Sequence, residues 1–312
     1  MKNEEIKVAV TSRSFSRNDI LRKELLHQYK NVKFNDDGLR LQGDVLIDFL
    51  QGCHKAITAL EVIDDDLLRR LPNLKVISKY GVGLDMIDMQ AMKNHNVKLG
   101  WTGGVNRRSV SELVISFAIA LLRHVPASHR EVLSGTWRQH IGGHLSGRTV
   151  GIIGCGYVGK DLIKMLQPFD CPILVNDIQM YDDFYKQYNI KVVEKEELLT
   201  NSDIVTLHVP LDDSTRNILS AEHLSLMKPD AILINIARGG LLDEDALKQM
   251  LMNGKLGGAA LDVFSIEPPT DQELLELPNF LVTPHIGGSA YEAILAMGIA
   301  AIDGLDNNKI VV

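Results

Sequence analysis

The sequence predicts an α/β fold with two doubly wound parallel-sheet domains, Rossmann-like in topology and separated by a cleft. Short apolar runs alternate with polar helical stretches along the chain, which is the pattern of parallel sheets covered by helices. A glycine-rich turn follows one of these runs in the middle of the chain rather than near its start. At 312 residues the chain is also long enough for about two separate cores.

The first hundred residues contain the strands of the first predicted domain. We expect these strands at 6–11, 56–60, 75–78 and 97–99, where short apolar runs lie between polar stretches. The segment 109–123 is apolar nearly all round. It therefore predicts a buried helix, which a second subunit could help to cover.

The second half repeats strand and helix around six further apolar runs. The number of runs matches a doubly wound dinucleotide-binding domain, with strands expected at 149–153, 173–176, 204–207, 231–235, 258–262 and 280–282. The alanine-rich tail 290–305 has helical spacing but is too short for a domain, so we expect it to return to the first domain. Glycines near both crossings favour short hinges. The predicted domains are residues 1–103 with 287–312, and residues 104–286.

Composition and charge argue against several classes of partner. The net charge is −7, the pI is about 5.8 and Lys and Arg are spread along the chain, so we expect no nucleic acid and no anionic membrane as partners. No apolar run is long enough to span a membrane and the N-terminus lacks a signal-peptide core, which predicts a cytoplasmic protein. Cys53, Cys155 and Cys171 have no metal-ligand spacing and are expected to be small buried hydrophobes in a reducing compartment. We therefore expect a small-molecule partner and no bound metal.

The glycine-rich turn has the spacing of a dinucleotide-binding fingerprint. Gly154, Gly156 and Gly159 follow the apolar run 149–153 and open a helical stretch. The first glycine permits the tight turn, the second lets the backbone approach a pyrophosphate, and the third lets the helix pack on the strand. Asp177 ends the next apolar run, where a carboxylate accepts hydrogen bonds from the adenine ribose and repels a ribose phosphate. This favours NAD over NADP, and the alternative for Asp177 is a solvated turn residue.

Three ionisable residues follow the last three predicted strands. Because ligands bind outside the carboxyl ends of parallel strands, we expect Arg238, Glu267 and His285 to line one crevice. A guanidinium can hold a carboxylate, and an imidazole can exchange a hydroxyl proton near neutral pH, so the set suits redox chemistry on a 2-hydroxy acid. Taken singly, the histidine could cap a helix, the arginine could be a surface charge, and the glutamate could be a solvated residue before a Pro-Pro turn.

Several ordered motifs resemble the D-isomer-specific 2-hydroxyacid dehydrogenases over nearly the whole chain. The second half contains Leu207-His208-Val209-Pro210-Leu211, Asn235-Ile236-Ala237-Arg238-Gly239-Gly240, Ala260-Leu261-Asp262-Val263-Phe264 with Glu267-Pro268, and Thr283-Pro284-His285. The first half contains Gly81-Val82-Gly83-Leu84-Asp85-Met86-Ile87-Asp88, and the crossing contains Asn106 with Ser109-Val110-Ser111-Glu112. Together these motifs are far more specific than the glycine turn alone.

The resemblance implies a role for each matching residue. It implies His285 as the acid/base, Glu267 as its partner, Arg238 as the cation that orients the substrate, and the amides around Val82 and Gly83 as the holders of the substrate carboxylate. The implied NAD contacts are Gly154, Gly156, Tyr157, Val158, Gly159, Asp177, Val209, Ile236, Ala237, Arg238, Asp262, His285, Gly287 and Gly288. The resemblance also implies an NAD domain inserted into a split substrate domain. A homodimer is implied through the NAD domains, with the helix 109–123 and the segment around Trp137 in its interface.

The substrate stays open between two groups of acids. The motifs 108–115 and 284–289 are most similar to the phosphoglycerate dehydrogenase branch, which favours 3-phosphoglycerate. Glu61 opposes this substrate, because that branch tends to have an arginine in this segment and a carboxylate repels a phosphate unless Arg107, Arg108 or a partner-subunit residue compensates. Glyoxylate, hydroxypyruvate and pyruvate are the alternatives. Members of this fold also include NAD-responsive corepressors, a different class that nothing in the sequence favours.

Overall fold

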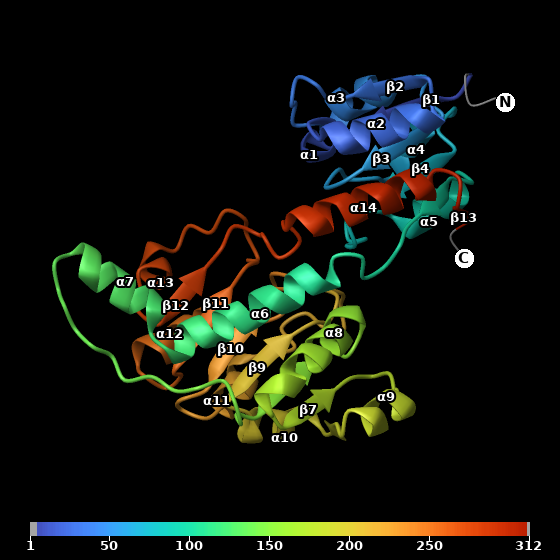
Figure 1. The fold of residues 1–312 in the computed structure, drawn as a ribbon. Helices are drawn as coiled ribbons and strands as arrows, with labels where there is room; N and C mark the ends of the chain where they lie inside the picture. The colour runs from blue at the N-terminus through green and yellow to red at the C-terminus, as the bar shows by residue number, and fades with distance from the viewer. Residues whose placement is uncertain (1–4, 311–312) are drawn as a thin grey trace. The chain divides into compact units, whose positions relative to one another are not determined.

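The computed structural model describes residues 5–310, which divide into two compact units (Figure 1). Unit 1 is the described part of Met1–Asn106 and Gly288–Val312, and unit 2 is Arg107–Gly287. The crossings fall three residues and one residue beyond the predicted boundaries at 103 and 286. Each unit has its own largely parallel sheet with helices on both faces, which confirms the predicted fold class.

The sheet of unit 1 has the strand order β13-β5-β4-β3-β1-β2 and is parallel except for the antiparallel pair of β13 with β5. Its strands are β1 (Lys7–Val10), β2 (Asn31–Phe34), β3 (Lys55–Thr58), β4 (Val76–Lys79), β5 (Lys98–Gly100) and β13 (Lys309–Ile310). The predicted strands of this unit are present within two residues at each end. Sequence patterns missed β2 and β13, because both are edge strands and neither contains a fully buried residue.

Two apolar clusters cover the two faces of this sheet. The helices of the unit are α1 (Arg13–Ser16), α2 (Asp19–Gln28), α3 (Gly43–Leu50), α4 (Asp65–Arg70), α5 (Met89–Asn94) and α14 (Tyr291–Gly304). In β1, Val8 and Val10 belong to the cluster with α2 and α14, whereas Ala9 belongs to the cluster with α3, α4 and α5. The C-terminal helix α14 packs on α2 and β4, as Figure 1 shows in red beside blue. The tail thus completes the sheet domain formed by the first hundred residues.

The sheet of unit 2 is entirely parallel and has the strand order β12-β11-β10-β9-β6-β7-β8. Its strands are β6 (Val150–Ile153), β7 (Ile173–Asn176), β8 (Lys191–Val192), β9 (Ile204–Leu207), β10 (Ile232–Asn235), β11 (Gly258–Leu261) and β12 (Phe280–Val282). Six of them match the predicted strands, and the seventh, β8, is a two-residue edge strand too short for a sequence pattern. The strand order reverses between β6 and β9, so the glycine turn that follows β6 lies at the topological switch point.

Helices cover both faces of the second sheet as well. They are α6 (Arg107–Leu122), α7 (Val125–Leu133), α8 (Tyr157–Leu166), α9 (Asp182–Gln187), α10 (Lys195–Asn201), α11 (Ala221–Ser225), α12 (Glu244–Met252) and α13 (Gln272–Leu275), with a 3-10 turn at Gln167–Phe169. The expected buried helix is α6, which packs on α8 and β10 inside its own unit. Within residues 5–310, no single helix is long and apolar enough to span a membrane. The pair of α6 and α7 passes that test together, by length and composition only, with a bend of 62°.

Candidate active site

The glycine turn after β6 is confined by the protein on one side and open on the other. Gly154 has a φ of +97°, and a Cβ there would lie 2.7 Å from the carbonyl of His208. A Cβ on Gly159 would lie 2.4 Å from the carbonyl oxygen of Gly154, so the helix can pack against the turn only without a side chain. A Cβ on Gly156, the residue before α8, would meet nothing within 4 Å. Two glycines are therefore required by the fold, and the third borders open space at a helix N-terminus.

Asp177, directly after β7, is tied to this turn. Its carboxylate accepts hydrogen bonds from the backbone N–H of Cys155 at 2.5 Å and from that of Gln179 at 2.7 Å. The Cys155 side chain is buried, and this burial raises the pKa of its thiol to about 11. The carboxylate predicted to meet an adenine ribose thus also holds the glycine turn in place.

Residues after β9 form another wall of the same turn. The Cγ1 of Val209 would lie 2.8 Å from a Cβ on Gly154, so this side chain packs directly on the turn. The Nε2 of His208 is 3.0 Å from the Oγ1 of Thr206, and burial of the imidazole lowers the pKa of His208 to about 3. The ring is therefore neutral at physiological pH. At the start of α8, Tyr157 is exposed, while Val158 packs partly into the core.

The loop after β10 carries Arg238. Asn235, the last residue of β10, brackets this loop: its Oδ1 accepts from the N–H of Ala237 at 3.0 Å and its Nδ2 donates to the carbonyl of Arg238 at 2.8 Å. The neighbouring Gly239 has no room for a side chain, because a Cβ would lie 1.9 Å from the carbonyl oxygen of Phe264. The Arg238 loop and the loop after β11 therefore touch through their backbones, a contact that sequence patterns did not predict.

His285 and Glu267 meet at the carboxyl edge of this sheet. The Nδ1 of His285 is 3.0 Å from the Oε2 of Glu267, and each side chain is a little less than half exposed. The other carboxylate oxygen of Glu267 accepts from the N–H of Phe264 at 3.2 Å. The structure thus pairs two of the three predicted catalytic side chains, and His285 caps no helix.

Asp262 organises the loop that contains His285. This carboxylate is buried and accepts three hydrogen bonds: from the Oγ1 of Thr283 at 2.5 Å, and from the N–H groups of Ile286 and Gly287 at 2.7 Å each. The backbone carbonyl of Asp262 also accepts from the N–H of His285 at 2.9 Å. These bonds hold His285 at a φ of +56°, a conformation that costs free energy in a non-glycine residue. Asp262 was predicted as a cofactor contact, and its role in shaping the loop was missed.

The predicted substrate turn lies in unit 1. Gly81, directly before Val82 and Gly83, has a φ of +125°, and a Cβ there would be 3.9 Å from the Cε of Lys79. The carbonyl of Val82 accepts a hydrogen bond from the Nε1 of Trp101 at 3.0 Å. Lys79 is itself buried and donates to the carbonyl of Ala59. The aliphatic Cε of a buried lysine therefore lies close to Gly81. Gly288 belongs to the same unit.

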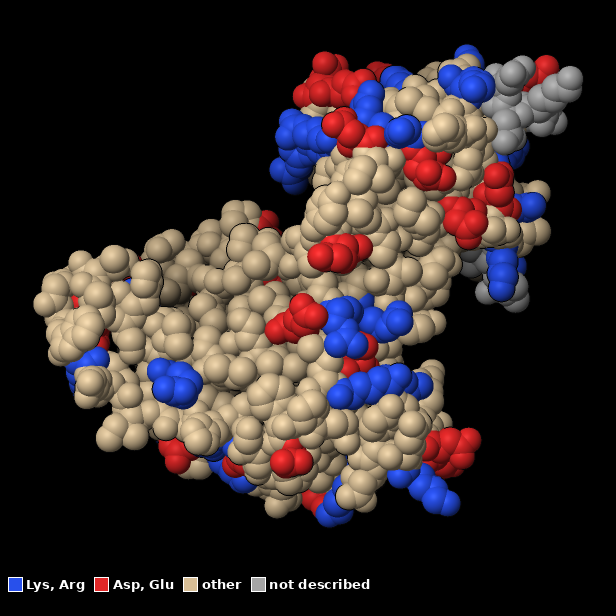
Figure 2. Space-filling view, in the orientation of Figure 1, with Lys and Arg blue, Asp and Glu red and all other residues tan. Residues whose placement is uncertain are grey.

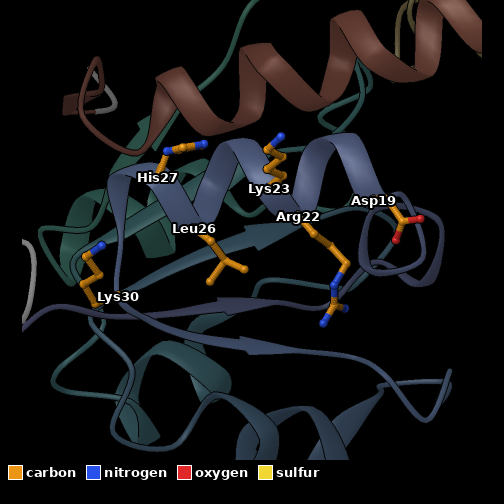
Figure 3. A pocket seen from close by; sticks show the side chains of 6 residues that line it. All are labelled: Asp19, Arg22, Lys23, Leu26, His27 and Lys30. Atoms are coloured by element: carbon orange, nitrogen blue, oxygen red, sulfur yellow. The ribbon is translucent and has the colours of Figure 1, made fainter.

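A shallow hollow of about 480 Å³ lies elsewhere, on the outer side of α2. Figure 3 shows the lining side chains projecting from this helix and the residues after it: Asp19, Arg22, Lys23, Leu26, His27 and Lys30. None of them is a predicted site residue. On the face drawn in Figure 2, charged side chains of both signs are interspersed.

Known proteins match both the sequence and the fold. The family described as "D-isomer specific 2-hydroxyacid dehydrogenase, NAD binding domain" matches residues 115–287. The chain belongs to this family. Its predicted membership is thereby confirmed, and unit 2 contains the NAD-binding domain.

Proteins named for different activities are similar to this chain. A hydroxypyruvate reductase of Thermotoga maritima is 38% identical over 245 residues, which are 76% of this chain and 78% of the relative. A D-3-phosphoglycerate dehydrogenase of Bacillus subtilis is 35% identical over 235 residues, 75% of this chain, but the match spans only 45% of that relative. A D-lactate dehydrogenase of Aquifex aeolicus, solved with NAD and lactic acid, has a TM-score of 0.83 at 25% identity and covers 95% of this chain and 93% of its own.

The family's cofactor fits the residues present in this chain. Gly156 leaves an open cradle where a side chain would otherwise stand, at the N-terminus of the ten-residue helix α8, where backbone N–H groups and the helix dipole favour phosphate oxygens. Asp177 places an acceptor beside that cradle. Enzymes of the family are NAD-dependent oxidoreductases that act on 2-hydroxy acids, and this donor and acceptor set suits NAD.

Proposed function

We propose that this chain catalyses the reversible NAD-dependent interconversion of a small D-2-hydroxy acid and its 2-oxo acid. The observation that carries the proposal is the pairing of His285 with Glu267 at 3.0 Å, at the carboxyl edge of the sheet that holds the glycine turn. A paired carboxylate and imidazole at a strand-end edge is an arrangement that enzymes use for general acid–base chemistry.

The proposed roles follow from the chemistry of each group and, for His285, from the orientation of its ring. Because Nδ1 of His285 faces Glu267, its Nε2 is the nitrogen left to exchange the substrate's hydroxyl proton. Arg238 would bind the substrate carboxylate, since its guanidinium presents paired donors. The amides around Val82 and Gly83 are further proposed carboxylate donors. When bound, NAD supplies or accepts the hydride.

The remaining predicted NAD contacts belong to the glycine turn and the strand-end loops of unit 2, except Gly288, which belongs to unit 1. Val209 packs on Gly154, and a Cβ on Gly287 would lie 2.8 Å from the Cγ2 of Ile236 and 3.1 Å from the Oδ2 of Asp262. We therefore assign cofactor contact to these residues, together with Gly156, Tyr157, Val158, Gly159, Asp177, Ala237, Arg238, His285 and Gly288.

For the substrate we propose an unphosphorylated acid of two or three carbons, such as glyoxylate, hydroxypyruvate or pyruvate. Glu61 follows β3 in unit 1, where the N–H of Ala59 donates to its carboxylate at 2.6 Å. A carboxylate held at this sheet edge disfavours a phosphate. The match to a hydroxypyruvate reductase, which covers 76% of this chain and 78% of that relative, supports the same group of acids.

3-Phosphoglycerate is the second candidate because of Lys79. Its side chain is buried, and its Cε would lie 3.9 Å from a Cβ on Gly81, so a cationic residue lies close to this turn. If this candidate is right, Lys79→Met should raise the KM for phosphohydroxypyruvate far more than the KM for hydroxypyruvate. Equal changes would remove the support for a phosphate.

We further infer a homodimer formed through unit 2. The helix α7 has no buried residue, and the segment after it exposes Trp137 at 86% and Ile141 at 96%. Figure 2 shows a largely uncharged surface around α7. Large apolar side chains in contiguous exposure mark interaction surfaces. Sedimentation should therefore give a mass near twice 34.6 kDa, and replacing Trp137 and Ile141 together by Asp should give monomers.

The deciding experiment is NADH absorbance with a panel of 2-oxo acids that includes phosphohydroxypyruvate. We expect turnover on at least one acid, and a loss of about 10² to 10⁴-fold in kcat for His285→Ala, the range for removing a general acid–base group. Unchanged turnover in His285→Ala would refute its role. Tight NADH binding without turnover on any acid would favour the NAD-sensing corepressor class instead.

The free thiols of Cys53, Cys155 and Cys171 support a reducing, cytoplasmic setting for the protein.

A further inference from the structure

Glu244, at the start of α12, connects this helix to the loop that contains Glu267. One carboxylate oxygen of Glu244, Oε1, accepts two hydrogen bonds from Ser265, one from its backbone N–H at 2.8 Å and one from its Oγ at 2.8 Å. The two residues are 21 positions apart in the sequence. Ser265 has an exposed side chain and lies two residues before Glu267, so this pair of bonds anchors a loop that is otherwise open to solvent.

Two separate contacts hold the loop after β11 in place. One is the backbone packing of Gly239 against Phe264, and the other is the carboxylate of Glu244 on Ser265. Between these contacts, the N–H of Phe264 donates to Glu267 and fixes one oxygen of its carboxylate. The other oxygen of Glu267 faces the imidazole of His285. Hydrogen bonds therefore join Glu244 to Ser265 and Phe264 to Glu267, and the covalent backbone between Phe264 and Ser265 connects the two.

We propose that Glu244 is a positioning residue for the Glu267–His285 pair. It contacts neither the imidazole nor the carboxylate of that pair; it acts through the backbone of Phe264 and Ser265. Charge-assisted hydrogen bonds to a carboxylate are shorter and stronger than neutral ones, so two such bonds from one serine restrain the loop effectively. Misplacement of a supporting group by about 1 Å can cost on the order of 100-fold in rate.

A purely structural alternative exists, because carboxylates in the first turn of a helix stabilise it through the helix dipole. Asp245, the next residue, is exposed and lies in the same first turn, and within residues 5–310 it makes no hydrogen bond to the loop after β11. Asp245→Ala therefore removes a comparable dipole interaction and leaves the Ser265 anchor intact. It is the matched control for Glu244→Ala.

The proposal rests on the proposed function, so its test uses kinetics and a readout that needs no turnover. We expect Glu244→Ala to lower kcat about tenfold with little change in the KM for NADH, Glu244→Gln to stay within about twofold because its Oε1 still accepts, and Asp245→Ala to match the parent enzyme. In a Glu267→Gln background, Glu244→Ala should cause no further loss, since it acts through Glu267. If Glu244→Ala folds poorly, Ser265→Ala removes one of the two bonds and should show a smaller loss in the same direction.

The second readout is the NMR chemical shift of the His285 ring protons at a fixed pH, assigned by comparison with His285→Gln. The chemical shift should change in Glu244→Ala and stay unchanged in Asp245→Ala, because a displaced Glu267 carboxylate alters the surroundings of the ring. Equal losses of kcat from Glu244→Ala with and without Glu267, or an unchanged chemical shift, would overturn the proposal. If no oxo acid is turned over but the chemical shift changes as expected, the proposed function fails and the positioning role stands.

Discussion

The two glycine turns of this molecule follow the same kind of element, a buried parallel strand, but they are held in different ways. In unit 2, a Cβ on Gly154 or Gly159 would lie within 2.7 or 2.4 Å of backbone atoms. In unit 1, a Cβ on Gly81 would meet only the Cε of Lys79, at 3.9 Å. The first turn is therefore confined by backbone contacts, whereas Gly81 has space around it and the second turn is held by the hydrogen bond from Trp101 to the carbonyl of Val82.

We expect the two turns to bind different anions, because different groups surround them. The turn after β6 opens directly into the ten-residue helix α8, so the N–H groups and dipole of a long helix add to the turn. The turn after β4 leads to the six-residue helix α5 only after a single β-bridge between Ile63 and Ile87. We predict that its own amides, with the cationic residue Lys79 close to Gly81, bind a carboxylate. A glycine turn after a strand thus has no single function, and its surroundings determine which anion it suits.

The largest effect should come from adding a methyl group to the confined turn. Gly154→Ala places a Cβ against the carbonyl of His208 at a φ of +97°, which combines overpacking with an unfavourable backbone conformation. We expect the free energy of unfolding to fall by about 2 to 5 kcal/mol and NADH binding to be lost. Urea unfolding and an NADH fluorescence titration measure the two effects. A variant as stable as the parent would show that this turn is not confined.

The open glycine of the same turn should separate folding from binding. A Cβ on Gly156 meets nothing within 4 Å, so Gly156→Ala should change the free energy of unfolding by less than about 0.5 kcal/mol. Its NADH affinity should nevertheless fall about tenfold or more, equivalent to about 1.4 kcal/mol, because the methyl group fills the phosphate cradle. Unchanged affinity would place the pyrophosphate elsewhere. The same titration with the Gly154→Ala protein provides the comparison.

The turn of unit 1 should respond more weakly. Gly81→Ala meets no close atom, but its φ of +125° strains any other residue by about 1 to 3 kcal/mol. We expect the KM for the 2-oxo acid to rise about fivefold to tenfold while the Kd for NADH stays unchanged. Steady-state kinetics at saturating NADH, with the binding titration as control, test this. A weaker Kd for NADH would contradict the assignment of this turn to the substrate.

The smallest effect concerns pH and the wall behind Gly154. Because burial lowers the pKa of His208 to about 3, the unfolded chain binds a proton there below about pH 6.5 and the folded chain does not. Stability is therefore lost as pH falls, by about 0.8 kcal/mol at pH 6. His208→Gln, which keeps a hydrogen-bonding group without titrating, should flatten the dependence of the urea midpoint on pH between 7.5 and 6. An equally steep dependence in the variant would assign it to other groups.

The features of the site that the sequence predicts depend on neighbouring residues, whereas the features it does not predict depend on contacts between residues far apart in the sequence. The strand ends that carry Arg238, Glu267 and His285 are visible as local patterns, because apolar runs and their polar ends are local in sequence. The contact of Gly239 with Phe264 and the bonds from Glu244 to Ser265 are not, because they join loops whose conformations no periodicity specifies. The edge strands β2, β8 and β13 were missed for a related reason: they are short and bury little.

The sequence by itself determined the doubly wound class, the position of the dinucleotide turn and the family, because each depends on residue types at fixed spacings. Only the tertiary structure decided how the pair of His285 and Glu267 is supported. Asp262 holds the His285 loop through three hydrogen bonds, and Glu244 holds the Glu267 loop through two. Such support depends on distances between groups brought together by packing, which the order of residues along the chain does not contain.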